Sequence, residues 1–357
     1  MRRNSDFDRL EQDWGISFHG VVDYAPDGWK RDYRRLGMDA QAVLASTPSA
    51  GLPSMLTSFI DPEIVRVATA PTKMAELLGE KQLGEWTGDT VFFPVTEETG
   101  EVSAYGDFNN NGRAGLNIFF PQRQAARFQI IVEYGALQVE RAGLAVGNYV
   151  SEVQTSAINR LNNYQNLTYL YGVQGLQNYG ILNSPGLPAA LTPATKGAGG
   201  VKWMNAGVVV ASANEVFNDI IALDTQLITQ SAGRIGPDTP ATLVIPSALI
   251  AALNNPNSFG LTAMAMLKAS YPNISVMTMP QYGALTAANP QGFAGGNIIQ
   301  LIAGTVDGVK TAYGAFSTKL KTFPLVQDVS STKQKFAQST WGAVVRRPWA
   351  VSTMVGV

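Results

Sequence analysis

The chain has 357 residues and a formal net charge of −1, with 15% charged and 45% hydrophobic residues. A near-neutral chain without a basic run does not suit tight sequence-independent binding to nucleic acid, which depends on many lysines and arginines. Because the chain has no cysteine, disulfides, thiolate zinc sites and cysteine nucleophiles are excluded. The low charge for this length predicts a surface that is largely covered by other subunits.

The first 39 residues mix positive and negative charges with large aromatic side chains. Such a segment cannot form its own core, so its aromatics need a surface supplied from elsewhere. The basic start is not followed by the apolar run of a signal peptide, and no stretch reaches the ~18 apolar residues of a membrane span, so we expect a cytoplasmic chain. We predict an arm that contacts a neighbour; a partly disordered tail is the alternative. The predicted contact residues are Trp14, Phe18, Trp29 and Tyr33.

Aromatic and β-branched residues with Thr-Gly and Asn-Gly turns predict a long β-hairpin from about Trp86 to Val132. Its tip, YGDFNNNGRAGLN, partly matches an EF-hand calcium loop, in which oxygen ligands alternate before a glycine. The twelfth position of such a loop is a bidentate Glu, and here it is Ile118. The flanks also resemble strands rather than helices, so we predict a polar hairpin tip and no metal site. The matching positions are Asp107, Asn109, Asn111 and Gly112.

Apolar residues at steps of three and four predict a helix from Ala136 to Tyr171. At 1.5 Å per residue this helix would be ~50 Å long, far beyond the usual three or four turns. Gly143 and Gly147 are the places where it would break. The predicted apolar face consists of Val139, Ala142, Val146, Val150, Val153, Ala157, Leu161, Tyr164 and Leu167.

Proline and glycine in YGILNSPGLPAALTPATKGAGG predict a loop, and a compact α+β layer follows over residues 205–320. Ser212 and Glu215 form a capping box that opens a helix. The segments ATLVIP, NISVMTMP and NIIQLIAG are apolar enough for buried strands. The tail STKQKFAQSTWGAVVRRPWAVSTMVGV is again strand-like.

Residues for catalysis or cofactor binding do not assemble into a recognisable pattern. The single histidine, His19, lies in the charged arm, and the glycines of GTVDGVKT have the wrong spacing for a phosphate loop, so we predict a turn between strands there. Paired carboxylates would suit a hydrolase, but Glu97, Glu98 and Glu101 lie on the hairpin. Arg346 and Arg347 suit either an anion or acidic groups on a neighbouring subunit, and we favour the neighbour. We therefore predict no catalytic, cofactor-binding or metal-binding residues.

Four motifs in order resemble the major capsid proteins of tailed bacteriophages with the Hong Kong 97-type fold. They are YGDFNNNGRAGLN, YGALQVERAGLAVGN, NYGILNSPGLP and the terminal WGAVVRRPWAV, and the likeness covers most of residues 60–357. The resemblance implies an α+β fold with an N-terminal arm (1–72) and an extended loop with flanking strands (73–133). It further implies a spine helix with the peripheral domain (134–184), an axial domain (185–320) and returning C-terminal strands (321–357).

The resemblance also implies a structural function without catalysis or cofactors. The chain would assemble into hexamers and pentamers of an icosahedral head that encloses double-stranded DNA. Its contact with this DNA would be weak and non-specific. Assembly would take place in the host cytoplasm, and the protein would be found in the virion. Scaffolding, portal and decoration proteins are candidate partners, and no membrane is expected. The tip would contact a neighbour through Asp107, Phe108, Asn109, Asn111 and Arg113, and Arg346 and Arg347 would form ion pairs between subunits.

Two alternatives remain at this point. An encapsulin-like nanocompartment has the same fold and a different cargo, and a soluble acid/base hydrolase would be a compact monomer. Some capsid relatives join a loop lysine to an asparagine of another subunit. The hairpin from Thr90 to Phe120 contains no lysine, so this crosslink is not expected here.

Overall fold

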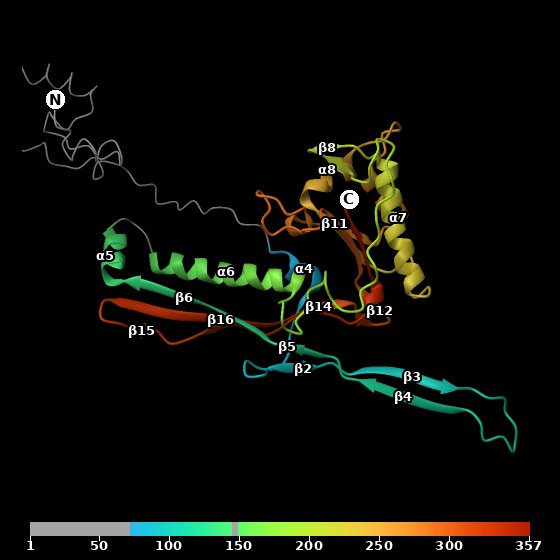
Figure 1. Ribbon diagram of the computed structural model, residues 1–357, viewed down its shortest axis with the longest axis horizontal. Helices are drawn as coiled ribbons and strands as arrows, with labels where there is room; N and C mark the ends of the chain where they lie inside the picture. Colours follow the sequence, from blue (N-terminus) through green and yellow to red (C-terminus); the bar gives the residue numbers. More distant parts are fainter. Residues whose placement is uncertain (1–71, 145–148) are drawn as a thin grey trace, which may run out of the picture. The chain divides into compact units, whose positions relative to one another are not determined.

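The computed structural model describes residues 72–144 and 149–357 (Figure 1). The predicted arm and its four aromatic residues lie outside the described residues. Apart from the end of one helix, the described elements belong to one compact unit, Val67–Arg141 and Asn148–Val357. Two sheets, each with helices packed on it, organise this unit.

The first sheet is built around one long strand, β16 (Ser331–Val345). One edge of β16 pairs antiparallel with β6 (Ala126–Gly135), and the other pairs antiparallel with β14 (Ala312–Thr322) and β15 (Val326–Gln327). The short strand β1 (Glu80–Gln82) adds to β14 in parallel. Strand β14 thus enters this sheet, although its residues up to 320 lie in the layer that the sequence assigned to the other domain.

Helix α6 (Tyr149–Tyr171) covers one face of this sheet (Figure 1). A second helix, α5 (Ala136–Leu144), precedes it, and the residues between them lie outside the described part, so a continuous helix from 136 to 171 stays a prediction. The predicted apolar face is correct at Ala157 and Leu161 and wrong at Val139 and Tyr164, which are 37% and 44% exposed. Gln165, the neighbour of Tyr164, is buried instead, because its amide donates to the Tyr169 hydroxyl at 2.7 Å.

The second sheet has the order β10 (Ile274–Met279), β9 (Ala241–Pro246), β11 (Ile298–Ala303) and β17 (Val351–Val355). Strands β9, β10 and β11 lie where the sequence predicted them, and β17 brings the C-terminal tail to the edge beside β11. Helices α7 (Ala213–Gln230), α8 (Ile250–Asn254) and α9 (Ala263–Ser270) pack here around a large apolar core. The predicted capping box at the start of α7 is confirmed.

Shorter elements complete the description. The predicted turn in GTVDGVKT is confirmed, since Asp307 and Gly308 have φ angles of 50° and 73°, as a two-residue hairpin turn requires. The remaining short elements are α4 (Met74–Leu78), β7 (Met204–Asn205), β8 (Val208–Val209), β12 (Thr305–Val306), β13 (Val309–Lys310) and the 3₁₀ turns Ser247–Leu249, Pro280–Tyr282 and Pro348–Ala350.

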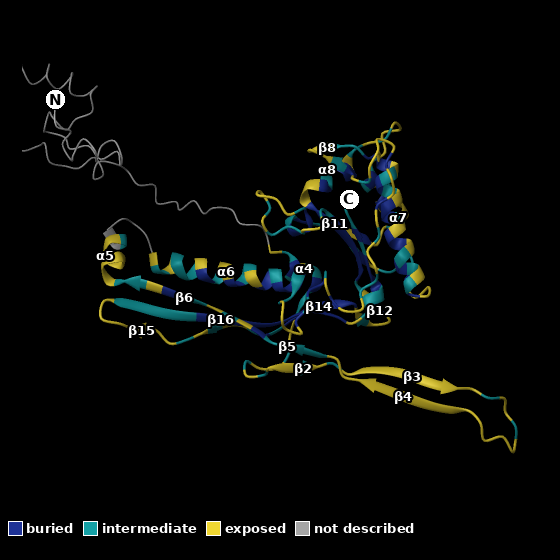
Figure 2. Cartoon of the chain, in the orientation of Figure 1, coloured by how far each residue is buried: buried dark blue, intermediate teal, exposed yellow. Residues whose placement is uncertain are grey.

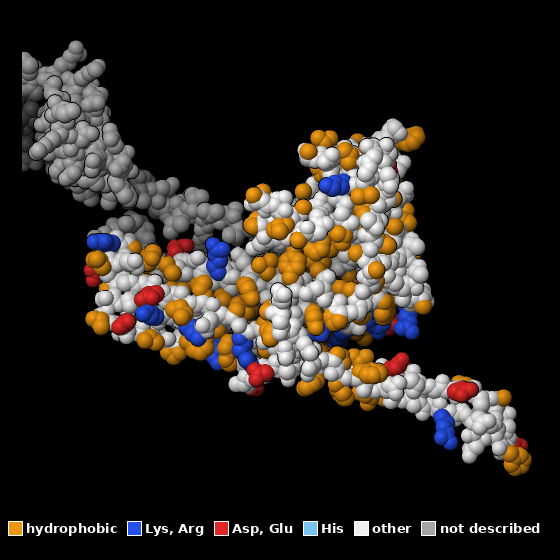
Figure 3. All heavy atoms as spheres, in the orientation of Figure 1, with side chains coloured by type: hydrophobic (Ala, Val, Ile, Leu, Met, Phe, Trp, Pro, Cys, Tyr) orange, Lys and Arg blue, Asp and Glu red, His pale blue; other side chains and the backbone are white. Residues whose placement is uncertain are grey.

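The extended hairpin has an inner and an outer pair of strands. The inner pair is β2 (Thr90–Phe92) with β5 (Gln122–Gln124), and the outer pair is β3 (Val95–Glu101) with β4 (Arg113–Phe119). The prediction that the hairpin continues to Val132 is wrong, because β6 leaves it and pairs with β16. Every residue of β3 and β4 is exposed (Figure 2), and hydrophobic side chains gather where the outer pair begins (Figure 3).

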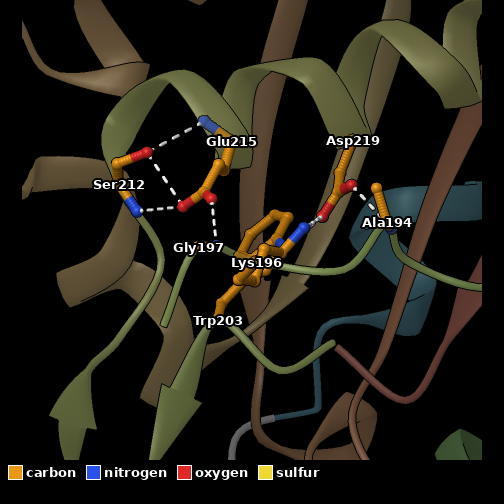
Figure 4. Close-up of polar contacts among 7 residues, drawn as sticks. All are labelled: Ala194, Lys196, Gly197, Trp203, Ser212, Glu215 and Asp219. Carbon is orange, nitrogen blue, oxygen red and sulfur yellow. Dashed lines mark hydrogen bonds and ion pairs between the residues drawn. The ribbon is translucent and has the colours of Figure 1, made fainter. Parts of the chain in front are cut away.

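A buried ion pair fastens the loop before α7 to that helix (Figure 4). The Lys196 ammonium lies 2.5 Å from a carboxylate oxygen of Asp219, and both side chains are at most 2% exposed. The same oxygen accepts from the Trp203 indole N–H at 2.7 Å, and the other accepts from the Ala194 amide at 3.2 Å. Because its charge is matched and both of its oxygens are hydrogen-bonded, Asp219 is tolerated in an apolar surrounding.

One turn earlier on α7, Glu215 fixes the same loop (Figure 4). Its carboxylate accepts from the Gly197 amide at 2.6 Å and from the Ser212 amide at 2.7 Å. These two bonds lower the pKa of Glu215 below its usual range, because they favour the ionised carboxylate. Their contribution to stability is therefore present above the unfolded-state pKa and is lost as the pH falls through the lowered folded-state pKa.

We predict that Asp219→Asn lowers the free energy of unfolding of the unassembled subunit by about 3–5 kcal/mol, because it leaves the Lys196 ammonium buried without its counter-charge. Replacing both partners with apolar residues, Lys196→Met with Asp219→Leu, should cost less than this single change. Urea denaturation followed by circular dichroism measures both. Glu215→Gln is the matched control on a partly exposed site and should cost less. A double variant that is less stable than Asp219→Asn would contradict this account.

Candidate functional site

The tip of the hairpin, residues 102–112, is held by its own hydrogen bonds. Asn109 is central: its side-chain oxygen accepts from the Asn111 amide at 3.0 Å, and its side-chain nitrogen donates to the Ala104 carbonyl at 2.7 Å. The Ser103 hydroxyl donates to the Asn111 carbonyl at 2.8 Å, across the loop. The tip therefore has a defined conformation although its residues are exposed or only partly buried.

Two side-chain oxygens at positions that match calcium ligands of an EF-hand accept hydrogen bonds within the tip instead. The Asp107 carboxylate accepts from the Tyr105 hydroxyl at 3.0 Å, and the Asn109 oxygen is occupied by the Asn111 amide. Among the described residues, no group of three or more His, Cys, Asp and Glu side chains is placed to hold a metal ion. The polar residues of the tip thus shape the loop.

The rings of the two aromatic residues of the tip remain exposed, although the Tyr105 hydroxyl is bound to Asp107. Phe108 is 101% exposed and Tyr105 is 94% exposed. A polar loop that presents two large aromatic side chains in this way resembles the contact surfaces of protein interfaces, where aromatic residues are enriched. Of the predicted contact residues, Phe108 is therefore the one with apolar area to bury, while Arg113 begins β4 opposite Glu101.

The two predicted arginines, Arg346 and Arg347, directly follow the last residue of β16. Arg347 pairs with Asp307 of its own chain at 2.9 Å, so the acidic partner that we expected on a neighbour is internal. The Arg346 guanidinium stacks over the Tyr313 ring, 5.1 Å from its centroid, and donates to the Tyr313 hydroxyl at 3.4 Å. Pairing of Arg346 with a neighbouring subunit stays a prediction.

Sequence reasoning missed a row of cations that alternate with aromatic rings beside the sheet. Arg127 and Lys321 lie 5.8 and 4.8 Å from the centroid of the Trp86 ring. Lys321 and Lys335 lie 5.4 and 5.5 Å from the centroid of Phe323. These five residues come from four separate stretches of the chain, so only the pairing of β6, β14 and β16 brings them together.

A pocket beside α6 does not resemble an acid/base site. It lies between α6 and the loops around residues 246–248 and 280–297, and Arg160 is the only ionisable residue in its lining. A hydrolase would need a general acid and a base within reach of one substrate, and this lining contains no such pair.

No helix of the described residues is long and apolar enough to cross a membrane.

Solved capsid structures share this fold at low sequence identity. The capsid protein of the Myoviridae phage XM1 is 14% identical, with a TM-score of 0.67, and the match covers 86% of this chain and 99% of that one. The capsid of cyanophage P-SCSP1u is 10% identical, with a TM-score of 0.54 and coverages of 88% and 97%. Gordonia phage Cozz is 13% identical, with a TM-score of 0.52 and coverages of 85% and 91%.

A family model places the chain more closely than these structures do. No curated protein matches the sequence. The model of the Pa193 gp26 major capsid protein, however, matches residues 43–356, which is most of the chain. With a fold shared by phage capsids and a hairpin exposed along both outer strands, the chain belongs to the Pa193 gp26 family of major capsid proteins.

Proposed function

We propose that this coat protein forms hexamers and pentamers that close into an icosahedral phage head around double-stranded DNA, without any catalysis of its own. The observation that carries the proposal is the outer hairpin, in which every residue of β3 and β4 is exposed. An isolated two-stranded ribbon is marginal in water, and one with exposed Phe and Leu side chains is also prone to association. The surface of an adjacent subunit would provide the layer that the hairpin lacks.

Domain roles follow from the two sheets. The first sheet with α6 would be the peripheral domain with its spine helix, and the second sheet with α7 to α9 would be the axial domain around the symmetry axis of each capsomer. Strands β16 and β17 then link the two domains from the C-terminal side. The domain limits of 1–72, 73–133, 134–184, 185–320 and 321–357 remain proposals. Strand β14 (Ala312–Thr322) crosses the limit between the last two of these segments and pairs in the first sheet.

The net charge of the chain bears on how the shell would contact its DNA. A net charge of −1 favours weak, non-specific contact with the packaged DNA, because few counterions would be released on binding. Weak contact suits a genome that must move while it is packed. Portal, scaffolding and decoration proteins would complete the head in the host cytoplasm. An encapsulin-like compartment would use the same subunit contacts and enclose another cargo.

The first prediction of this proposal is that purified wild-type protein forms rings of five or six subunits or closed shells. Negative-stain electron microscopy and analytical ultracentrifugation detect both. Recombinant shells provide the second test, since the nucleic acid found inside them distinguishes a phage head from a protein compartment. A compact monomer at all accessible concentrations would contradict the proposal.

At the tip, we predict that Phe108→Ala weakens assembly while the free subunit keeps its stability. The side chain is fully exposed in the subunit, so its removal should change the free energy of unfolding by less than about 0.5 kcal/mol. In the shell, each lost aromatic contact is worth about 2 kcal/mol. Asn110→Ala, two residues away, is the matched control and should assemble like the wild type. Equal assembly of the two variants would exclude Phe108 from the contact.

For the arm, which lies outside the described residues, we predict that removal of residues 1–36 destabilises particles but not subunits. Its aromatics, Trp14, Phe18, Trp29 and Tyr33, need a partner surface, and burying each would contribute about 2 kcal/mol. Differential scanning calorimetry of truncated and full-length particles measures the effect as a lower melting temperature. Particles that melt at the same temperature would mean that the arm is a passive tail.

A further inference from the structure

The face of the first sheet opposite α6 is open and basic. Alternate residues of β6, among them Phe128 and Val132, pack towards α6 together with Phe336 of β16. Because side chains alternate along a strand, the residues between them point to the other face. That face contains Lys335 directly opposite Ile131, and Lys333 opposite Glu133.

Neighbouring strands extend this face in register. Val326 of β15 lies opposite Lys333, and Lys321 of β14 lies opposite Ala337. Two apolar side chains on it are well exposed, Ile131 at 57% and Val326 at 61%. We call the face formed by Ile131, Lys321, Val326, Lys333 and Lys335 the basic face.

Two of its lysines are held in place without being neutralised. Within the described parts of the chain, neither Lys321 nor Lys335 has a carboxylate partner, whereas Lys333 contacts Glu133 at 3.3 Å and Asp328 at 3.6 Å. Lys321 and Lys335 instead lie over the Phe323 ring. An aromatic ring attracts an ammonium through its quadrupole but carries no net charge, so both positive charges remain available to an incoming anion.

The outer hairpin has the complementary pattern. Opposite residues of an antiparallel pair lie on the same side of the ribbon, so Glu98 and Leu116 share one side with Thr96 and Ile118. Leu116 is 55% exposed and Ile118 is 51% exposed. One side of the ribbon thus presents a carboxylate next to two exposed aliphatic side chains of the opposite strand.

The other side of the ribbon is more polar along its outer part. It contains Glu97 opposite Asn117, whose amide donates to the Glu97 carboxylate at 3.4 Å. Glu97 therefore already has a partner within the ribbon. The side that contains Glu98 combines apolar area with an acid that has no ion pair to the described residues, which is what a basic and partly apolar surface requires.

We propose that the Glu98 side of the hairpin of one subunit lies on the basic face of a second copy, with Glu98 between Lys321 and Lys335 and with Leu116 and Ile118 against Ile131 and Val326. This inference rests on the proposed shell function and adds the receiving surface and the side of the ribbon that binds it. Ion pairs set the register, while the aliphatic contacts exclude water from them.

Charge reversal tests the docking, because every hairpin in a shell of identical subunits meets the same face. Glu98→Lys alone and Lys335→Glu alone should each lower the assembled fraction at least about tenfold, since like charges would meet. The two changes combined in one chain should restore assembly to within about twofold of the wild type. Glu97→Lys, one residue along on the other side of the ribbon, is the matched control and should assemble nearly normally.

The readouts separate the possible results. Circular dichroism and thermal melting first establish that each unassembled variant is folded, and sedimentation velocity then gives the assembled fraction. Failure of the double reversal to restore assembly, or equal effects of Glu97→Lys and Glu98→Lys, would overturn the docking. Lys335→Glu shells that form normally but retain less DNA would also overturn it and assign the basic face to nucleic acid. A wild-type chain that never assembles would instead overturn the proposed shell function.

Discussion

The pairing of β16 with β6 is the interaction on which the other parts of the described fold depend. Ten consecutive residues of β16, from Ser331 to Thr340, pair with residues 126–135 of β6. This ladder joins the strand that leaves the hairpin to the strand that approaches the C-terminal end. It creates the surface on which α6 packs and, on its other side, the basic face. A change of register by one residue would exchange these two faces, because side chains alternate with a period of two.

Short-range patterns in the sequence predicted many of the elements correctly. The capping box of Ser212 and Glu215, the strands β9, β10 and β11 and the turn at Asp307 all depend on residues close in sequence. Four motifs in order were enough to indicate the capsid family, which the family model then identified. Local propensity and capping act within a few residues, so a single sequence is sufficient to detect them.

The errors have a common cause in contacts between distant residues. The alternating residues of β6 suit a hairpin strand as well as a sheet strand, and its true partner lies some 200 residues later in β16. Polar residues of α6 are buried for the same reason: Asn166 accepts from the Met74 amide at 3.1 Å, a partner that helical periodicity does not reveal. The cation row of Lys321 and Lys335 likewise appears only when β14 and β16 pair. None of these partners can be inferred from local pattern.

The position of β16 and β17 in chain order has a consequence for synthesis. Every other described strand precedes them, yet β16 is the centre of the first sheet and β17 is an edge of the second. A nascent chain can form helices and local turns as it emerges, but the first sheet lacks its central strand until β16 has left the ribosome, and the second lacks an edge strand until β17 has followed. Fragments released before β16 is translated lack both strands and therefore the Lys333 and Lys335 side chains of the basic face. Only chains translated beyond β17 can therefore complete both sheets.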